Sequence, residues 1–558
     1  MDGLQPISYS TGPRSHGFDR GSNVGLTYKC NMADSLGQDN TGLGVHQAAR
    51  LEKLRKIESR GLDPWGQRFD NRSFISEARD LAGQVKFRKG DGSLVELPKF
   101  DAASTENPID YKAWKASQGE GEEVGPVVRV AGRIILLRSA GKLYFLNIRD
   151  WTGDVQILIA KGQVSDEDME LVKLLDFGDL VGIDGRLGRT NTGELTVFAT
   201  KLHFMTKTLE PPPEKHAGLQ DPELRQRMRY LDLTYNQESM DRFLKRTKII
   251  HSIRATLAKH RFIEVEGPTL HTIAGGAAAK PFLTHHNALD MQLFLRIALE
   301  LHLKRLLVGG IERVYEMGRV YRNEGISPKH NPEFTMIELY WAYANYETMM
   351  DLTQQIIVEA IQATGQGFKL KWGDLDIDFT PPFQRRTYSD LFEEHTGLKV
   401  DDADGIAKLA KRIGIDVSGK HPDVIKSEVF EEKVEDSLIG PIFVIDYPAS
   451  ICPLTKRKAG SPDIAERFEL FIHGMELANA YTELNDPILQ EELFRTQLEG
   501  MAEEDSMAKM DHDFVRALRY GMPPAGGLGI GIDRLIMLLT DAKSIRDVIL
   551  FPLLREEV

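Results

Sequence analysis

A chain of 558 residues is longer than one hydrophobic core normally serves, so its length predicts two or three domains. The composition, with 41% hydrophobic and 27% charged residues, is typical of a globular protein in water. The net charge of −13 argues against a protein that coats nucleic acid, although it is compatible with a local nucleic-acid site.

The two cysteines, Cys30 and Cys452, belong to no CxxC motif or Cys/His cluster. We therefore expect neither a disulfide framework nor a structural zinc site, and a reducing cytoplasm suits the chain. The N-terminal sequence has no apolar leader, and no run approaches eighteen apolar residues. These features predict a cytoplasmic protein that does not enter a membrane.

The N-terminal region is predicted to contain little regular structure. Residues 1–45 are rich in Gly, Ser and Asn without periodicity, which is typical of a disordered extension. Residues 46–123 are expected to hold a helix and a polar insertion. The sequence HQAARLEKLRKIESRG, from His46, indicates an amphipathic helix that stops at Gly61. Residues 84–123 are polar and irregular, and are interpreted as an insertion or linker.

Five short segments with alternating apolar residues follow within residues 124–207, separated by Gly, Asn and Asp. This pattern predicts a small β-barrel. The region has eleven Lys or Arg residues against ten Asp or Glu, a slight basic surplus in an acidic chain. Residues 208–236 begin with a Pro-rich stretch and are predicted to form a hinge with a short helix.

Residues 237–558 form the largest predicted domain. It opens with a helix whose apolar residues Phe243, Ile250, Ile253 and Leu257 are expected on one face. Strands and helices follow without the regularity of βαβ units. The fold class is therefore predicted to be α+β, with a mainly antiparallel sheet.

A predicted hairpin with the sequence YRNEGISPKHNPEFTMIELY combines cations, carboxylates and aromatic rings. Because side chains alternate along a strand, Arg322 and Glu324 are expected on one face of the first strand. Phe334, Glu338 and Tyr340 are expected on one face of the second strand. The pattern predicts a shared cleft. A solvated hairpin surface with scattered ion pairs is an equally good interpretation of this stretch alone.

The sequence AGGLGIGIDRLIML predicts a glycine-rich strand that runs into a helix with Arg534 in its first turn. Gly527, Gly529 and Gly531 match neither GxxxxGK[ST] nor GxGxxG, so P-loop and Rossmann sites are excluded. Alternate glycines leave one strand face bare for a flat ligand or another backbone. Tight packing between the strand and the helix is the alternative interpretation.

The stretch RFELFIHGMELANAYTELND alternates carboxylates with polar side chains. Glu469 and Glu476 are candidate ligands of a hard cation such as Mg²⁺, which prefers carboxylate and phosphate oxygens. A plain two-residue turn between them places both on one face but puts Asn479 on the other. The sequence therefore predicts either a β-bulge here or a different register.

These stretches together resemble a known family. YRNEGISPKHNPEF, GLGIGIDR and FIEVEGPTL resemble motifs 2, 3 and 1 of class II aminoacyl-tRNA synthetases. GGAAAKPFLTHHNALD, NEGISPKHNPEFTMIELY, YTELND and SIRDVILFP are similar to the bacterial-type lysyl-tRNA synthetase family, and the resemblance covers residues 46–558 apart from the polar insertion. It implies an N-terminal OB-fold that binds the anticodon, a class II catalytic domain with an antiparallel sheet flanked by helices, and a homodimer.

The resemblance implies ATP-dependent ligation of L-lysine to tRNA(Lys) through a lysyl-adenylate intermediate, with Mg²⁺ as cofactor. The implied catalytic residues are Arg322 and Arg534. The implied ATP-binding residues are Arg322, Glu324, His330, Asn331, Phe334, Glu476 and Arg534. The implied lysine-binding residues are Gly276, Glu300, Arg322, Glu338, Tyr340, Asn479, Tyr481 and Glu483. The implied Mg²⁺ ligands are Glu469 and Glu476, and the implied anticodon-binding residues are Arg133, Phe145, Gln156 and Glu194.

The charges assigned to the amino-acid pocket agree with lysine as substrate. Three carboxylates, those of Glu300, Glu338 and Glu483, stand against one substrate-facing cation, Arg322. Such a surplus of negative charge suits a substrate with two ammonium groups. Taken alone, Glu300 is better interpreted as a helix-surface partner of Lys304 four residues on, whereas the surrounding motif favours the pocket.

Two other functions stay open at the level of sequence. A paralogue that charges another acceptor, such as a lysine residue of a protein, is one, although such paralogues usually lack the OB-fold. A tRNA-binding protein without catalysis is the other, and the presence of Arg322, Arg534 and Glu483 argues against it. In the barrel, Phe145 is either a base-stacking residue or part of the apolar core.

Overall fold

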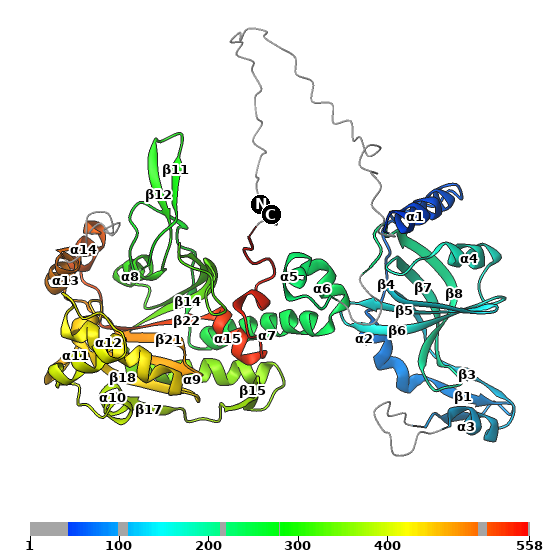
Figure 1. The fold of residues 1–558 in the computed structure, drawn as a ribbon. Coiled ribbons are helices and arrows are strands. Elements are labelled where there is room, and N and C mark those ends of the chain that lie inside the picture. Colours follow the sequence, from blue (N-terminus) through cyan, green and yellow to red (C-terminus); the bar gives the residue numbers. More distant parts are fainter. Residues whose placement is uncertain (1–42, 99–109, 213–218, 278, 500–510, 556–558) are drawn as a thin grey trace, which may run out of the picture. The chain divides into compact units, whose positions relative to one another are not determined.

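The computed structural model describes residues 43–98, 110–212, 219–277, 279–499 and 511–555 (Figure 1). The chain divides into two compact units, Met1–Pro212 and Pro213–Val558. Of the predicted disordered extension, residues 1–42 lie outside the described residues, whereas residues 43–45 begin the first helix. None of the described helices combines the length and the apolar content that crossing a bilayer requires.

The first unit is built around a closed barrel with the strand order β4-β5-β6-β8-β7. Buried and less buried residues alternate along much of β4, because successive side chains point into the barrel and away from it. The barrel predicted within residues 124–207 is therefore confirmed. Its strands are β4 (Val127–Ala140), β5 (Leu143–Asp150), β6 (Gly153–Ala160), β7 (Leu180–Arg189) and β8 (Leu195–Thr206).

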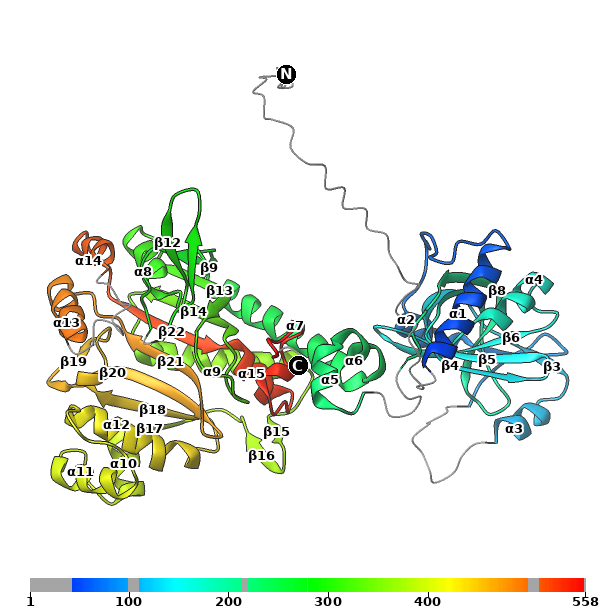
Figure 2. The ribbon, with the colours of Figure 1, turned by 45° about the horizontal axis from the view of Figure 1, so that its top comes forward.

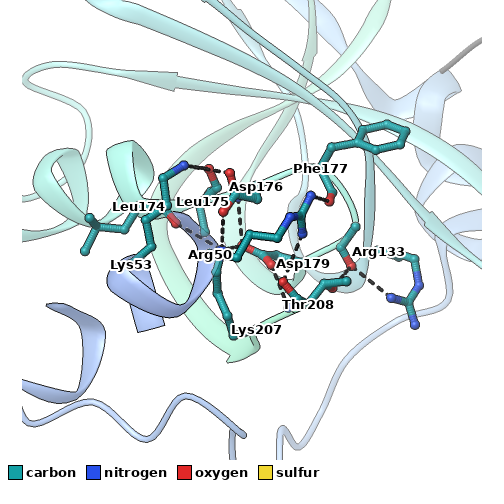
Figure 3. A network of polar contacts seen from close by, with 11 residues as sticks. Arg50, Lys53, Arg133, Leu174, Leu175, Asp176, Phe177, Asp179, Lys207 and Thr208 are labelled. Atoms are coloured by element: carbon teal, nitrogen blue, oxygen red, sulfur yellow. Dashed lines mark hydrogen bonds and ion pairs between the residues drawn. The ribbon is translucent and has the colours of Figure 1, made fainter. Parts of the chain in front are cut away.

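The predicted N-terminal helix is α1 (Leu43–Glu58), which lies against the barrel (Figure 2). It begins three residues before the predicted start at His46, and the chain turns at Gly61, whose φ is 74°. Arg50 on α1 donates hydrogen bonds to the carbonyls of Phe177 and Thr208, both at 2.9 Å (Figure 3). Polar contacts thus fix this helix on the barrel.

The prediction that residues 84–123 form an irregular linker is wrong for the residues described there. They form a three-stranded sheet with the order β2-β1-β3 and a helix beside it. The Tyr111 and Trp114 rings stack at 5.5 Å on the helix, and Trp114 meets Phe87 of β1 edge-on at 6.1 Å. Strands this short carry too few apolar residues for a sequence pattern to reveal them. The elements are β1 (Lys86–Lys89), β2 (Leu94–Glu96), α3 (Tyr111–Ser117) and β3 (Gly121–Val124).

The second unit contains a nine-stranded sheet with the order β17-β18-β20-β21-β22-β14-β13-β9 and with β19 paired to β20. Its pairs are antiparallel except β17–β18 and β9–β13 at the two ends, which confirms the predicted α+β class. The strands are β9 (Ile263–Glu264), β13 (Arg313–Tyr321), β14 (Glu333–Ala342), β17 (Gln384–Thr387), β18 (Ile442–Pro448), β19 (Arg457–Lys458), β20 (Ser461–Ile472), β21 (Met475–Thr482) and β22 (Ala525–Gly531).

Helices α7 (Gln237–Lys259) and α9 (Tyr346–Ala363) pack together within the main hydrophobic core. The buried face of α7 carries Ile249, Ile253 and Leu257, with Ile250 partly buried beside them. Phe243, predicted on this face, lies instead 5.3 Å from the Arg229 guanidinium. The first turns of α7 pack against the preceding short helix rather than in the core, so the predicted apolar face is shorter than its periodicity indicates.

Two smaller parts complete the second unit. Strands β11 and β12 project as a hairpin (Figure 1), and helices α10 to α12 form a separate hydrophobic cluster beside β18. The remaining strands are β10 (Leu270–His271), β11 (Leu283–His286), β12 (Met291–Leu295), β15 (Lys369–Trp372) and β16 (Leu375–Asp378). The remaining helices are α2 (Ile75–Asp80), α4 (Asp166–Leu171), α5 (Pro222–Arg227), α6 (Arg229–Tyr235), α8 (Glu300–Val308), α10 (Tyr388–Thr396), α11 (Ala403–Arg412), α12 (Pro422–Lys433), α13 (Pro487–Glu499), α14 (His512–Arg519) and α15 (Ile532–Leu539).

Candidate active site

The second unit holds a cavity of about 1580 Å³, lined by residues of β14, β21 and β22 and by the loops around them. The structure brings most of the predicted catalytic-domain residues together here. Only Glu469 and Glu483 of that set do not line it. The predicted residues that do are Gly276, Glu300, Arg322, Glu324, His330, Asn331, Phe334, Glu338, Tyr340, Glu476, Asn479, Tyr481 and Arg534.

The hairpin β13–β14 supplies one wall of the cavity. Strand β13 ends one residue before Arg322, so Arg322 and Glu324 lie in the loop and not on the strand as predicted. The Arg322 amide donates to the carbonyl of Pro332, which continues the register two residues beyond the pair Val320–Phe334. Arg322 therefore shares a face with Phe334, and its guanidinium lies 5.2 Å from that ring. Within the described parts of the chain, Arg322 forms no ion pair.

At another wall, α15 presents Arg534 beside the hairpin loop. Its guanidinium donates to the Glu476 carbonyl at 2.7 Å and to His330 Nε2 at 3.1 Å. Burial and the neighbouring Arg534 lower the pKa of His330, so the ring is neutral at pH 7. Because arginine only donates, the ring proton lies on Nδ1, which is 2.8 Å from Ser327 Oγ. This network holds Arg534 while leaving part of its guanidinium accessible.

Two carboxylates meet at the N-terminus of α8. Glu338 accepts hydrogen bonds from the Leu299 amide at 3.0 Å and from the Tyr340 hydroxyl at 3.2 Å, and Glu300 is the first residue of the helix. A helix N-terminus favours negative charge. Burial and the nearby Glu300 nevertheless raise the pKa of Glu338 to about 7. Gly276, whose φ is 87°, lies close to this pair. A Cβ added to Gly276 would lie 3.4 Å from the Cβ of Glu300.

Glu483 is fully buried beneath the cavity surface. Its Oε2 forms an ion pair with Lys304, which is itself fully buried and also lies 2.5 Å from Glu300 Oε1. Burial raises the pKa of Glu483, and Lys304 opposes this shift. Lys304 was considered from sequence only as a partner of Glu300 on the helix surface. The four-residue spacing signalled the pair, but not its burial or its second partner.

The glycine-rich strand β22 packs closely against side chains of neighbouring strands and also lines the cavity. A Cβ at Gly527 would lie 1.8 Å from Glu483 Oε1 and 2.7 Å from Tyr340 Cε1, so close packing requires glycine there. At Gly529 the nearest atom would be 3.6 Å away. Gly529 and Gly531 line the cavity, where their bare backbone leaves room for a ligand.

A β-bulge lies between Glu469 and Glu476, as one of the two sequence alternatives predicts. Glu469 pairs with Asn479 across β20–β21, and the register shifts between Leu470 and Phe471. Burial and the neighbouring Glu476 raise the pKa of Glu469, while Arg467 opposes the rise. Glu476 lines the cavity, whereas Glu469 lies just behind it and accepts a hydrogen bond from Tyr447 at 2.8 Å.

The donor chemistry at this pair fits Mg²⁺. Glu469, whose pKa is raised in part by Glu476, gains from a cation shared by the two carboxylates. Mg²⁺ is commonly bound by one or two carboxylates plus substrate phosphates. The described residues contain no group of three or more His, Cys, Asp or Glu side chains placed to hold a metal. Phosphate oxygens of a nucleotide would therefore complete the coordination of such an ion.

Several buried oxygen atoms near the cavity accept no hydrogen bond within the described residues. They are Asn331 Oδ1, Asn479 Oδ1 and Glu483 Oε1. Asn331 uses its amide nitrogen to donate to the Glu333 carbonyl at 2.6 Å, which orders the loop. Buried polar atoms normally have partners, so such atoms are expected to bind groups of a ligand.

The barrel of the first unit has a cavity of about 530 Å³. Phe145 and Gln156 line it, and Phe145 lies outside the barrel's hydrophobic core cluster. Gln156 donates to Thr196 Oγ1 at 2.8 Å. Sequence reasoning missed Arg138, which lies directly opposite Phe145 and places its guanidinium 5.0 Å from that ring.

The other two predicted anticodon residues lie elsewhere on the barrel. Arg133 donates to the Gly178 carbonyl at 2.9 Å and belongs to the polar network beneath α1 (Figure 3), not to the cavity lining. Glu194 is exposed just before β8 and does not line the cavity either. Arg133 and Arg138 both lie on β4, and the register with β5 places Arg138 opposite Phe145 and Arg133 opposite Arg149.

Comparison with known proteins agrees with this geometry. The family described as tRNA synthetases class II (D, K and N) matches residues 221–555, and the OB-fold nucleic acid binding domain matches residues 128–204. A lysine–tRNA ligase of Bacillus cereus (strain AH187) is 46% identical over 516 residues, which cover 91% of this chain and 97% of that protein. A lysine–tRNA ligase of Thermoanaerobacter sp. (strain X514) is 44% identical over 531 residues, which cover 94% and 99%.

Proposed function

The chain belongs to the class II tRNA synthetases of the D, K and N group, and on that premise we propose that it joins L-lysine to tRNA(Lys). The reaction consumes ATP, passes through lysyl-adenylate and releases pyrophosphate and then AMP. The observation that carries the choice of amino acid is a group of three buried carboxylates, Glu300 and Glu338 in the cavity lining and Glu483 beneath it.

In the first step the α-carboxylate of lysine attacks the α-phosphorus of ATP, and the bond to pyrophosphate breaks. An α-carboxyl group has a pKa near ~3.5, so the nucleophile is already ionised and needs no base. The site must instead align the reactants and neutralise phosphate charge. Arg322 suits this role, because it enters the cavity without an ion-pair partner in the described chain, and its planar fork binds carboxylate and phosphate.

ATP is proposed to occupy the part of the cavity between the hairpin loop and α15. Phe334 would stack on adenine, and Glu324 would accept a hydrogen bond from the adenine amino group. Arg534, held by the Glu476 carbonyl and His330, would bind the γ-phosphate. The support is a cationic, ring-lined wall made by these residues in one cavity.

Mg²⁺ is proposed as the cofactor, held by Glu469 and Glu476 together with the nucleotide phosphates. When bound, it neutralises the negative charge that builds up on the phosphates. The protein's own contribution is the bulge, which brings Glu476 into the cavity lining beside Asn479. Removal of divalent ions with EDTA is expected to abolish pyrophosphate exchange and to leave the fold intact.

Lysine is proposed to lie with its α-ammonium beside Glu300, Glu338 and Gly276 and its carboxylate beside Arg322. Its ε-ammonium would approach Glu483 and Tyr340, with Asn479 and Tyr481 completing the wall. Glu483 offers a buried carboxylate whose Oε1 lies against the bare face of Gly527. An uncharged side chain would leave that carboxylate without a cation, at a cost on the order of 3–5 kcal/mol.

The barrel is proposed to bind the anticodon of tRNA(Lys) through Phe145, Gln156 and Arg138. Single-stranded bases stack on aromatic rings and on arginine, and hydrogen-bond through their edges. Arg133 and Glu194 remain candidates for contacts with the RNA outside the cavity. The presence of the barrel also favours this function over a paralogue that modifies a protein.

We also propose a cytoplasmic homodimer. Strand β9 at the end of the large sheet and the nearby strands β10 and β11 expose Ile263, Leu270 and Leu283. Exposed apolar side chains gathered near a sheet edge suit an interface between two copies. Light scattering coupled to size-exclusion chromatography would measure this, and a monomer at micromolar concentration would contradict it.

The test of the main proposal is amino-acid-dependent ATP–pyrophosphate exchange with each of the twenty amino acids, followed by charging of tRNA(Lys). Exchange with lysine above all others, and lysyl-tRNA formation, are expected. Absence of lysine-dependent exchange would refute the ligase, whereas exchange without transfer to tRNA would favour the paralogue.

A further inference from the structure

One buried ammonium group connects two parts of the proposed lysine site. Lys304, on the first turns of α8, has no exposed side-chain surface. Its Nζ lies 2.5 Å from Glu300 Oε1 and forms an ion pair with Glu483 Oε2. These carboxylates come from the start of α8 and from the residue after β21, and the ring of Tyr340 lies 5.9 Å from the same Nζ.

Lys304 keeps its charge despite complete burial. Burial lowers the pKa of Lys304, but Glu300 and Glu483 together raise it well above the ordinary value. A buried cation of this kind is costly unless carboxylates surround it, and removing one member of such a group leaves the others uncompensated. The three side chains therefore act as one electrostatic unit.

Glu483 depends on this contact more than Glu300 does. Its Oε1 accepts no hydrogen bond in the described chain, and Lys304 is the ion-pair partner of its Oε2 there. The other charged or titratable groups around it are Glu300 on α8, Glu338 and Tyr340 on β14, and Tyr481 on β21. Glu300 and Glu338 disfavour a negative charge on Glu483, the two tyrosines are neutral, and Lys304 favours the charge.

From this arrangement we propose that Lys304 is a positioning residue that keeps Glu483 ionised and fixed for the ε-ammonium of lysine. This inference rests on the proposed function. Lys304 holds Oε2, and Oε1 stays without a partner beside Gly527, where a second ammonium can bind. Lys304 thereby sets the spacing between the two ends of the substrate, because the same Nζ also holds Glu300.

Charge balance supports the assignment. The three carboxylates and the two cations, Lys304 and Arg322, leave one net negative charge when all are ionised. Lysine at neutral pH carries two ammonium groups and one carboxylate, which is one net positive charge. Without Lys304 the site would hold three carboxylates and one cation, which is two net negative charges when all are ionised. One carboxylate would then take up a proton.

The test is Lys304→Gln, in which an amide of similar length can still donate hydrogen bonds to both carboxylates. We expect the KM for lysine in pyrophosphate exchange to rise about 10–100-fold at pH 7. It should fall again by up to about tenfold per pH unit between pH 7 and about 8.5, where lysine keeps both ammonium groups, because Glu483 must lose a proton to bind the ε-ammonium. The KM for ATP should change less than about twofold.

A matched control is available in the barrel. Lys207 is equally buried and lies 2.6 Å from Asp176 and 2.7 Å from Asp179 (Figure 3). Lys207→Gln removes the same kind of buried ammonium in the other unit, and exchange requires no tRNA. It should lower Tm by a similar amount while leaving the KM for lysine and its pH dependence as in the wild type.

Lys304→Arg keeps the charge and decides the case if Lys304→Gln does not fold. Its KM for lysine should stay on the wild-type pH curve. A wild-type KM in Lys304→Gln, a lowered KM, a rise that does not depend on pH, or a pH-dependent rise in Lys304→Arg would each overturn the proposal. If the wild type shows no lysine-dependent exchange, the proposed function itself fails first, so the two failures are distinguishable.

Discussion

Gly527 offers a sharp test of how closely the lysine site is packed. In Gly527→Ala the new Cβ would lie 1.8 Å from Glu483 Oε1 and 2.7 Å from Tyr340 Cε1. Non-bonded carbon atoms sit about 3.5–4.0 Å apart, so the carboxylate must move by more than about 1 Å. Lys304 and the buried surroundings restrict that movement on the other side.

We expect two effects of this substitution. Overpacking of a buried site lowers the free energy of unfolding by about 1–3 kcal/mol. Displacement of a substrate-binding group by about 1 Å lowers kcat/KM for lysine by about 10²-fold. Urea denaturation measures the first effect and pyrophosphate exchange with a lysine titration measures the second, while the KM for ATP should change little.

Gly529→Ala is the control for folding, two residues along the same strand. Its Cβ would meet no atom nearer than 3.6 Å, so the free energy of unfolding should change by less than about 0.5 kcal/mol. Wild-type stability and wild-type kcat/KM for lysine in Gly527→Ala would refute the packing argument. Equal destabilisation by both substitutions would also contradict it.

Four further predictions follow from the two cavities. Glu483→Gln should lower kcat/KM for lysine by about 10²–10³-fold, since it removes the charge opposite the ε-ammonium, and a normal value in the exchange assay would disprove that assignment. Glu338, whose pKa is raised to about 7, must be ionised to bind the α-ammonium, so the KM for lysine should rise as the pH falls below about 7; a flat profile from pH 6 to 8 would exclude this role. Arg322→Lys should lower kcat by at least about 10²-fold because one ammonium cannot replace the planar fork, and single-turnover adenylate formation would measure it. Phe145→Ala should weaken the binding of tRNA(Lys) by about 1–3 kcal/mol, seen as a higher KM for tRNA in charging, and should leave pyrophosphate exchange unchanged. An unchanged KM for tRNA would show that the bases bind elsewhere.

Much of the fold and part of the site were accessible from local patterns. Alternation of side chains placed Phe334, Glu338 and Tyr340 on one face of β14, and they line one cavity. Five alternating segments indicated the barrel. Such patterns depend only on the geometry of a single strand, so a sequence carries them directly.

Features that depend on register or on short polar elements were less accessible. The bulge between Glu469 and Glu476 was one of two sequence alternatives, and only the strand pairing decided between them. The same holds for the barrel cavity, where pairing of β4 with β5 places Arg138, and not Arg133, beside Phe145. The small sheet within residues 84–123 carried too few apolar residues to be recognised.

By itself, the sequence determined the family, the barrel and the charged residue types needed to bind ATP and lysine. Only the tertiary structure decided that Lys304 is buried between Glu300 and Glu483 and that Gly527 must be bare beside them. The physical reason is burial. Removing the Lys304 charge from the buried pair with Glu300 would leave a buried carboxylate without a cation, which destabilises the site. Burial is a property of the packed chain, because it depends on strands and helices that lie far apart in sequence.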